Sequence, residues 1–277
     1  MHTHLHPPRL FAAIRRWFAE RSSWVIDHPS EPEAVAAVLR DAGVERFVFC
    51  SYAHKPGMAA ELNAWLAATS RQLGGYGLPL ATVHLDDPTP SADLERALAD
   101  GCIGLKLHED VQRLAIDDPR FAEPFDLMAE REAFLLVHVG PIPWSQDTND
   151  GPARVARVLQ RHPRLRVVVA HLGVPDSRRY FALVPRFPNL FLDTTMAFAA
   201  PSSLVAGVSA GDLAPVARAI VYGTDYPNIP YPYGRERTAL EGLGVSDAAL
   251  HAILRENAMR LSPALSRPGN SGTAPEV

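Results

Sequence analysis

The sequence predicts an α/β fold in which a single (β/α)8 TIM barrel spans residues 1–261 and a disordered tail spans residues 262–277. Eight apolar strands are predicted, and seven of them are preceded by at least one helical segment, which is typical of a parallel sheet. The strand cores are mostly apolar throughout, as expected when both faces of a strand are buried. A doubly wound open sheet is the alternative, but it needs a glycine-rich loop after its first strand, where residues 5–8 read Leu-His-Pro-Pro.

The elements follow one another in a regular order along the chain. The first strand carries histidines at the start of the sequence and is very short. Apolar runs predict the other strands at residues 46–51, 78–85, 102–107, 133–139, 165–170, 189–194 and 220–223. Apolar residues at helical spacing predict the helices, which cover residues 7–20, 30–42, 58–69, 91–100, 119–132, 151–161, 177–187, 212–219, 234–243 and 246–261.

Composition excludes several classes of protein. The 277 residues are 47% hydrophobic, which is enough to bury a sizeable core. The net charge is -4 without any basic run, so nucleic acid is a poor partner, and no apolar run reaches the ~18 residues of a membrane span. The polar N-terminus lacks the apolar segment of a signal peptide. Cys50 and Cys102 lie in apolar strands, so we expect two buried thiols and a cytoplasmic protein.

The first residues contain an alternating pair of histidines. Side chains two residues apart in a strand point to the same side, so His2 and His4 would lie about 7 Å apart on one face. Two neutral imidazoles placed in this way can bind one metal ion. The alternative is a flexible, tag-like leader without a fixed partner. His6 continues the spacing, but it would lie past the strand end and ranks below the pair.

Metal-competent side chains close five of the eight predicted strands. Any one of them alone is more simply explained as a core histidine or a capping carboxylate. A TIM barrel, however, forms its active site at the carboxyl ends of its strands, so five such ends favour a shared site. The residues at these ends are His2 and His4, Lys106 and His108, His138, His171, and Asp225.

These segments resemble the amidohydrolase superfamily of metal-dependent hydrolases, and in particular its amidohydrolase-related branch, also called amidohydrolase 2. The His-x-His pair alone is a weak signal, whereas the ordered set is specific and spans nearly the whole chain up to the tail. The matching segments are His2-Thr-His4, Gly104-Leu-Lys-Leu-His108, Leu136-Val-His138, Val168-Val-Ala-His-Leu-Gly173, Tyr222-Gly-Thr-Asp-Tyr-Pro227 and Ile253-Leu-Arg-Glu-Asn-Ala-Met-Arg-Leu261.

The resemblance implies a site for one or two divalent metal ions. It places His2, His4 and Asp225 around the more buried ion. With one ion, His138 joins this set and His171 orients the attacking water. With two ions, His138 and His171 hold the second one. Zn²⁺ is the expected metal, and Mn²⁺ is the alternative.

Lys106 has two interpretations that the sequence leaves open. The resemblance places it where a carboxylated lysine would bridge two metal ions. An unmodified lysine is protonated at neutral pH and is a poor ligand. Such a lysine could pair with an anionic part of the substrate instead.

The resemblance also implies an enzyme that acts on a small molecule. A divalent metal lowers the pKa of water towards ~7 and can polarise a carbonyl oxygen. Asp225 is then expected to take the proton and His171 to steady the oxyanion, in a hydrolase that cleaves an amide or an ester/lactone bond. The alternative is a metal-dependent non-oxidative decarboxylase of an aromatic or unsaturated carboxylic acid, and a third hypothesis is a non-catalytic metal-binding protein.

The loop after the second strand supplies the candidate substrate contacts Tyr52, His54 and Lys55. Lys55 is equally explained as a solvated charge in a Lys-Pro-Gly turn. Arg178 and Arg179 could bind an anion, but paired arginines on a helix surface are commoner.

The first strand departs from the family pattern, because Met1 immediately precedes the histidine pair. Either this strand is very short or the native start lies upstream. A short strand predicts a partly unpaired seam between the first and eighth strands, and a looser hold on two ligands. The sequence leaves the oligomeric state open, a homo-oligomer included.

Overall fold

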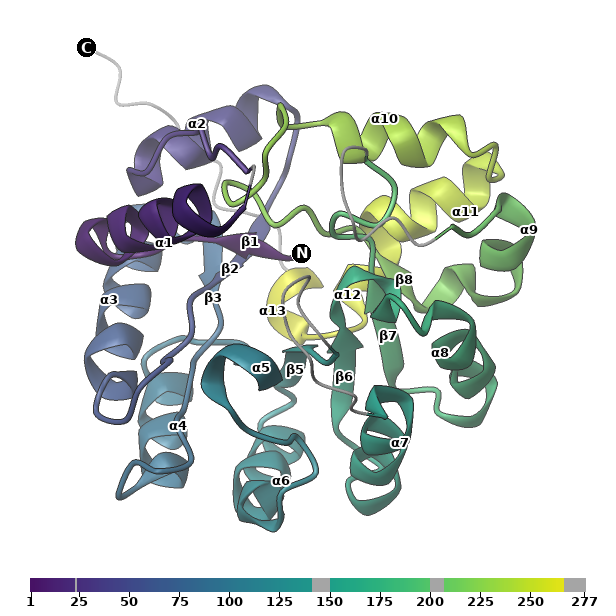
Figure 1. Cartoon of the computed structure of the whole chain (residues 1–277). Helices are drawn as coiled ribbons and strands as arrows, with labels where there is room; N and C mark the ends of the chain where they lie inside the picture. The colour runs from purple at the N-terminus through teal and green to yellow at the C-terminus, as the bar shows by residue number, and fades with distance from the viewer. Residues whose placement is uncertain (23, 141–149, 200–206, 267–277) are drawn as a thin grey trace.

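Eight parallel strands form a barrel, and the helices surround it (Figure 1). The structure, a computed structural model, describes residues 1–22, 24–140, 150–199 and 207–266. It confirms the predicted (β/α)8 architecture and the very short first strand. The strands are β1 (Thr3–His4), β2 (Phe47–Cys50), β3 (Gly77–Pro79), β4 (Gly104–His108), β5 (Phe134–His138), β6 (Arg166–Val169), β7 (Leu190–Asp193) and β8 (Ile220–Val221).

Backbone hydrogen bonds close the barrel where the two ladders β1–β2–β3 and β4–β5–β6–β7–β8 meet. Between β3 and β4, the amide of Lys106 donates to the carbonyl of Ala81 at 2.8 Å. Between β8 and β1, the amide of His4 donates to the carbonyl of Tyr226 at 2.7 Å, and the amide of Asp225 donates to the carbonyl of His2 at 2.8 Å. The expectation of a partly unpaired seam was therefore wrong, because the loop after β8 supplies the partners that a longer strand would have supplied.

The helices alternate with the strands. One addition to the prediction is α5, which begins directly after β4, where the ring of His108 accepts a hydrogen bond from the amide of Val111. The helices are α1 (Pro8–Arg21), α2 (Pro32–Asp41), α3 (Ala59–Gln72), α4 (Pro90–Ala99), α5 (Glu109–Gln112), α6 (Ala122–Glu130), α7 (Gly151–Arg161), α8 (Ser177–Leu183), α9 (Ala210–Leu213), α10 (Arg235–Gly242), α11 (Asp247–His251), α12 (Asn257–Met259) and α13 (Pro263–Ser266).

The predicted tail at 262–277 begins differently from the expectation. Its first residues form α13, and the guanidinium of Arg46 donates to the carbonyl of Ala264 at 2.7 Å. Residues 267–277 lie outside the described part of the chain. Packing against the barrel thus orders residues that the Pro- and Ser-rich composition assigned to the tail.

The barrel interior is filled by one apolar cluster, and two larger clusters lie between the strands and the surrounding helices. Leu261 is fully buried in the interior cluster, with Leu265 of α13 packed against it. Met1 and Ile103, which precede β1 and β4, pack against the same cluster, so α12 and α13 close the end of the barrel where the strands begin. Functional side chains are therefore left to the opposite end, where the strands finish.

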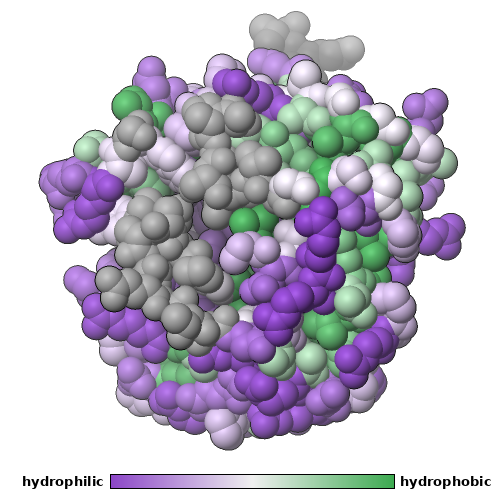
Figure 2. Space-filling model, turned by 45° about the vertical axis from the view of Figure 1, so that its right-hand side comes forward, coloured by the Kyte–Doolittle hydropathy of each residue, from purple (hydrophilic) through white to green (hydrophobic). Residues whose placement is uncertain are grey.

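Large hydrophobic side chains are seldom exposed among the described residues. Hydrophilic and hydrophobic residues are interspersed on the side shown in Figure 2. Among the described residues, Val25 is the large hydrophobic side chain that stands out as exposed. No helix in the described ranges combines the length and the apolar character needed to cross a membrane.

A groove of about 1690 Å³ runs along the outside of the β1–β8 seam, between α2 and α10. Thr3 and Thr224, whose neighbours in sequence face the barrel, contribute to its wall. None of the strand-end histidines lines this groove. It is therefore separate from the chemistry considered below.

Candidate metal centre

The two histidines of the first stretch converge on one carboxylate oxygen. Nε2 of His2 lies 3.2 Å from Oδ1 of Asp225, and Nε2 of His4 lies 3.0 Å from the same atom. His2 and His4 are 1% and 4% exposed, whereas the side chain of Asp225 is 16% exposed. The tag-like leader is thereby excluded, because this stretch is a buried barrel strand.

Asp193, at the end of β7, holds this arrangement in place, and the sequence analysis gave it no role. Its Oδ2 lies 2.9 Å from Nδ1 of His2, and its Oδ1 accepts hydrogen bonds from the amides of His171 and Thr195 at 2.9 Å each. A carboxylate can only accept, so Nδ1 of His2 donates to it and Nε2 is the nitrogen directed at Asp225. The signal that could have identified Asp193 was its position at the end of an apolar strand, which it shares with the other site residues.

A second group of histidines closes the neighbouring strands. His108 and His138 end β4 and β5, and their rings stack at 4.1 Å with an interplanar angle of 7°. The His171 ring meets the His138 ring edge-on at 4.8 Å and lies 5.7 Å from the ring of His2. Nδ1 of His171 donates to the carbonyl of Thr195 at 2.9 Å, which leaves its Nε2 without a partner among the hydrogen bonds of the described residues. The histidines from β1, β4, β5 and β6 therefore form one continuous set of rings.

Lys106 of β4 extends into the same cluster. Its Nζ lies 2.8 Å from Nε2 of His2, and the residue is 1% exposed. The structure thus brings together His2, His4, Lys106, His138, His171 and Asp225, all six positions that the resemblance implied as ligands.

The atoms at the centre of this cluster fit a divalent cation. Two imidazole nitrogens and a carboxylate oxygen carry lone pairs, and at about 3 Å they repel one another unless a shared proton or metal ion lies between them. Imidazole and carboxylate are ordinary ligands of Zn²⁺ and Mn²⁺. The donor set is therefore suitable for the metal that the fold implies.

Two of these residues occupy an uncommon backbone conformation. His171 and Asp225 have φ angles of 57° and 61°, in the left-handed region that costs non-glycine residues free energy. Gly223 explains how the segment before Asp225 can approach so closely. A Cβ added there would lie 2.3 Å from Oγ1 of Thr195 and 3.1 Å from Cγ of Asp193. The glycine thus permits β8 to pack directly against the residues that orient His2.

Burial and charge act in opposite directions on these groups. Burial favours the neutral form of Asp225, but the charges of His2 and His4 outweigh it and keep the pKa of that carboxyl well below its ordinary value. Burial and Lys106 lower the pKa of His2, but Asp193 and Asp225 together raise it above its ordinary value. Burial similarly lowers the pKa of His4, but the charges of Cys50 and Asp225 raise it to about 10. In the absence of a metal ion, protons are therefore shared between the histidines and the carboxylates of this cluster.

The predicted substrate contacts separate into two sets. The ring of Tyr52 lies edge-on to His4 at 6.1 Å and 5.4 Å from His108, so the structure brings it to the cluster. Lys55 is exposed, and the neighbours that influence His54 are Lys55 and His84 instead of the clustered histidines. Contact of these residues with a substrate stays a prediction, with Tyr52 the best placed of the three.

The arginine pair proposed as an anion site is engaged elsewhere. Arg178 pairs with Asp212 at 3.3 Å, and Arg179 pairs with Asp150 at 2.7 Å. These exposed ion pairs favour the surface interpretation over a role in the site.

His6 is closer to the centre than its rank in the sequence suggested. It lies past β1 as expected, but it is 2% exposed and stacks on His4 at 5.3 Å. Its Nδ1 lies 2.8 Å from Oγ of Ser51, and its Nε2 lies 3.3 Å from Nδ2 of Asn228. His6 thus buttresses His4, a role that depends on residues distant in the sequence.

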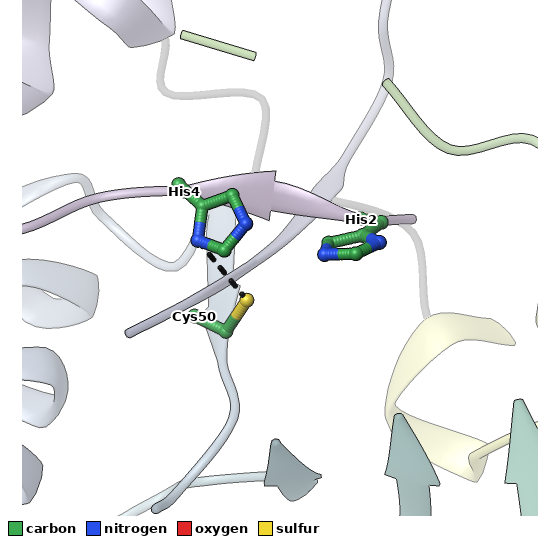
Figure 3. Close-up of side chains that lie close together, drawn as sticks. All are labelled: His2, His4 and Cys50. Carbon is green, nitrogen blue, oxygen red and sulfur yellow. Dashed lines mark hydrogen bonds between the residues drawn. The ribbon is translucent and has the colours of Figure 1, made fainter. Parts of the chain in front are cut away.

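Cys50 is the remaining side chain at this centre that the sequence left without a function. It ends β2, beside β1, and its Sγ lies 3.6 Å from Nδ1 of His4 (Figure 3). Burial acts to raise the pKa of this thiol, but the charge of His4 and contacts with His2 and His4 lower it to about 5. Cys50 therefore contacts the metal centre through the nitrogen of His4 that faces away from Asp225.

A sequence model of the amidohydrolase family matches residues 1–262. The chain belongs to this family. A curated dihydroorotase of Alkalilimnicola ehrlichii is 32% identical to this chain over 123 residues. These residues cover 40% of this chain and only 36% of the dihydroorotase. The barrel and the ordered histidine set thus correspond to the resemblance seen in the sequence.

Solved structures share the architecture of this chain. An uncharacterised TIM-barrel protein from Bordetella bronchiseptica has a TM-score of 0.71 at 20% identity, with 96% of this chain and 100% of that chain covered. A 2,6-dihydroxybenzoate decarboxylase from Rhizobium has a TM-score of 0.67 at 17% identity, with 94% and 96% covered. At these identities the likeness establishes the TIM-barrel fold, and the reaction must be argued from the site.

Proposed function

We propose that this amidohydrolase is a metal-dependent hydrolase that cleaves an amide or ester/lactone bond of a small molecule. The observation that carries the proposal is the convergence of His2 and His4 on Oδ1 of Asp225, at 3.2 and 3.0 Å, in a buried site. In this proposal His2, His4 and Asp225 bind a divalent ion, Zn²⁺ or Mn²⁺. His138 and His171 complete its surroundings or hold a second ion, with Lys106 beside them.

Each residue then has a task that its surroundings support. When bound, the ion supplies a water molecule of lowered pKa and polarises a carbonyl oxygen. Asp225, whose carboxylate would also hold the ion, would take the proton of an attacking water and return it to the leaving group. His171 donates from Nδ1 to the carbonyl of Thr195, so in the neutral ring Nε2 carries the lone pair and would accept a hydrogen bond from the attacking water. Asp193 keeps His2 in the tautomer that offers Nε2 to the metal.

The site itself supports a small-molecule substrate, because its polar atoms lie inside a barrel end. Both cysteines are free and buried, which agrees with the cytoplasmic location expected from the sequence. The dihydroorotase relative suggests dihydroorotate as a first probe, and simple lactones extend the test to ester bonds.

Metal dependence is the decisive experiment. The purified protein should contain a divalent metal by elemental analysis, lose hydrolysis of its best probe after treatment with a strong chelator, and regain it with Zn²⁺ or Mn²⁺. Asp225→Asn should remain inactive after the same treatment. Hydrolysis that is indifferent to metal removal would contradict the proposal.

A decarboxylase is the second candidate, and the buried amine of Lys106 beside His2 is the observation that favours it. An unmodified ammonium there would attract a substrate carboxylate. Lys55 and Arg178 give no support, because Lys55 is exposed and Arg178 pairs with Asp212. Release of carbon dioxide from 2,6-dihydroxybenzoate, lost in Lys106→Met, would favour this reaction. A carboxylated Lys106 seen by mass spectrometry of the native protein would count against it.

A further inference from the structure

The ring of His4 has two different chemical environments. Its Nε2 lies 3.0 Å from a carboxylate oxygen of Asp225, whereas its Nδ1 lies 3.6 Å from Sγ of Cys50. The hydrolytic mechanism uses the first side of the ring and leaves the thiol on the second side unused. Cys50 is 0% exposed, so solvent plays no part in this contact.

His2, His4 and Cys50 together offer three converging ligand atoms. One ligand atom from each residue lies within 4.8 Å of those of the other two, and all three residues are buried. Figure 3 shows the thiol of Cys50 directed at the His4 ring from β2, with the ring of His2 beside it on β1. Three donors from two adjacent strands thus surround one small volume.

The distance between nitrogen and sulfur fits a bound ion. A tetrahedral ion at ~2.0–2.1 Å from an imidazole nitrogen and ~2.3 Å from a thiolate sulfur holds those two atoms ~3.6 Å apart. The hydrogen-bonded contact of 3.6 Å between Nδ1 of His4 and Sγ of Cys50 equals this zinc value, so a larger thiophilic ion requires only that these two side chains separate slightly. The carbonyl of Thr3 lies 3.4 Å from the same sulfur as a hydrogen-bond acceptor.

We propose that His2, His4 and Cys50 form a second cation position, the thiol-side position, which binds a thiophilic ion such as Cd²⁺. Soft ions prefer thiolate and imidazole to carboxylate, so Cys50 distinguishes this position from that formed with Asp225. Binding displaces to solvent the proton shared between Cys50 and His4 as the metal–sulfur bond forms. The inference extends the proposed function, because both positions share His2 and His4. An ion at the thiol-side position withdraws these ligands from Asp225 and inhibits hydrolysis.

The test is a titration of the metal-free full-length protein with Cd²⁺, followed by the ultraviolet charge-transfer absorption of a cadmium–thiolate bond. The wild type should develop this absorption and saturate at about one equivalent, and Cys50→Ser should lose it. Cys102→Ser is the matched control, because Cys102 is also free and buried but lies in the apolar cluster between barrel and helices. It should behave as the wild type does.

Each outcome decides for or against the thiol-side position. Absence of the absorption in the folded wild type overturns it without reference to any variant. Persistence in Cys50→Ser, or equal loss in Cys102→Ser, overturns it as well, and Cys50→Ala with a circular dichroism spectrum checks that folding is intact.

Equilibrium dialysis with Zn²⁺ and Mn²⁺ separates this inference from the proposed function. If the wild type and Cys50→Ser both bind these ions but no cadmium–thiolate absorption appears, the thiol-side position is wrong and the hydrolytic metal site stands. If the wild type binds neither Zn²⁺ nor Mn²⁺ nor Cd²⁺, both proposals fail together.

Discussion

Two groups of histidines share one end of the barrel, yet their surroundings differ. The carboxylate-paired histidines, His2 and His4, lie on β1 and contact Asp193 and Asp225. The stacked histidines, His108, His138 and His171, close β4, β5 and β6 and mainly contact one another. The same side chain at the same end of a strand thus has two different electrostatic environments.

The difference appears in the direction of the pKa shifts. The carboxylates raise the pKa of His2 and His4 above the ordinary value in spite of burial. Burial, reinforced by His108, lowers the pKa of His138, and burial lowers the pKa of His171 although Asp225 and Asp193 act to raise it. Without a metal ion, the first group holds protons that a metal must displace, whereas the second group is neutral and ready to bind. The comparison predicts that removing a carboxylate costs far more than removing a stacked ring.

The largest effect is expected from Asp225→Asn. Asparagine preserves the shape of the side chain but cannot take a proton, so hydrolysis of the best probe should fall by ~10²–10⁴-fold. Steady-state kinetics with excess Zn²⁺ would measure it. Asp126→Asn, which removes an exposed partner of His162, is the matched control and should leave the rate unchanged. A small effect of Asp225→Asn would contradict the importance assigned to the carboxylate that His2 and His4 share.

Asp193→Asn should destabilise the metal-free protein by ~3–5 kcal/mol at neutral pH, because it removes the carboxylate that pairs with Nδ1 of the buried His2 and leaves only the contact with Asp225. Urea unfolding would measure the difference. The folded protein holds the pKa of Asp193 below its ordinary 3.8, so this stabilisation is present above pH 3.8 and is lost as the pH falls further. The wild type and the variant should therefore converge in acid, and a constant gap would contradict this account.

Gly223→Ala tests the close packing on the carboxylate-paired side. A Cβ there would lie 2.3 Å from Oγ1 of Thr195, so we expect a loss of ~1–3 kcal/mol in the free energy of unfolding. Gly242→Ala is the matched control, because a Cβ at that helical position meets nothing within 4 Å. Equal stability of the two variants would show that the β8 segment can move away from Asp193.

The smallest effect is expected from His138→Gln, measured by urea unfolding in the presence of a chelator. The variant removes a ring stacked on His108 at 4.1 Å, which should cost ~0.5–1.5 kcal/mol. A cost equal to that of Asp193→Asn would remove the distinction between the two groups.

The sequence analysis found the residues that meet at this end of the barrel because they share a local signal. His138, His171 and Asp225 each stand at the end of an apolar run, and this pattern can be recognised without knowledge of the fold. It could not find the function of Cys50 or the burial of His6. Their roles depend on which strand lies beside β1, and no sequence spacing contains that information.

The seam between β1 and β8 is a second feature that the sequence could not predict. A first strand of two residues looked too short to close the barrel, and the sequence predicted unpaired backbone there. The loop after β8 supplies those hydrogen bonds from Asp225 and Tyr226, more than two hundred residues away. For Arg178 and Lys55 the sequence left a surface role and a role in the site open, and in the structure Lys55 is exposed and Arg178 pairs with Asp212.

By itself, the sequence determined the barrel, the end of it that carries chemistry, and the six residues that meet there. The pattern of apolar strands with polar ends is visible in the sequence. Burial of both faces requires apolar residues along the strand, and the chemistry of the site requires polar residues at its end. Only the tertiary structure decided which histidines carry protons, which carboxylate orients His2, and that a thiol faces His4. Those properties depend on distances of about 3 Å between residues of different strands, and closure of the barrel alone sets such distances.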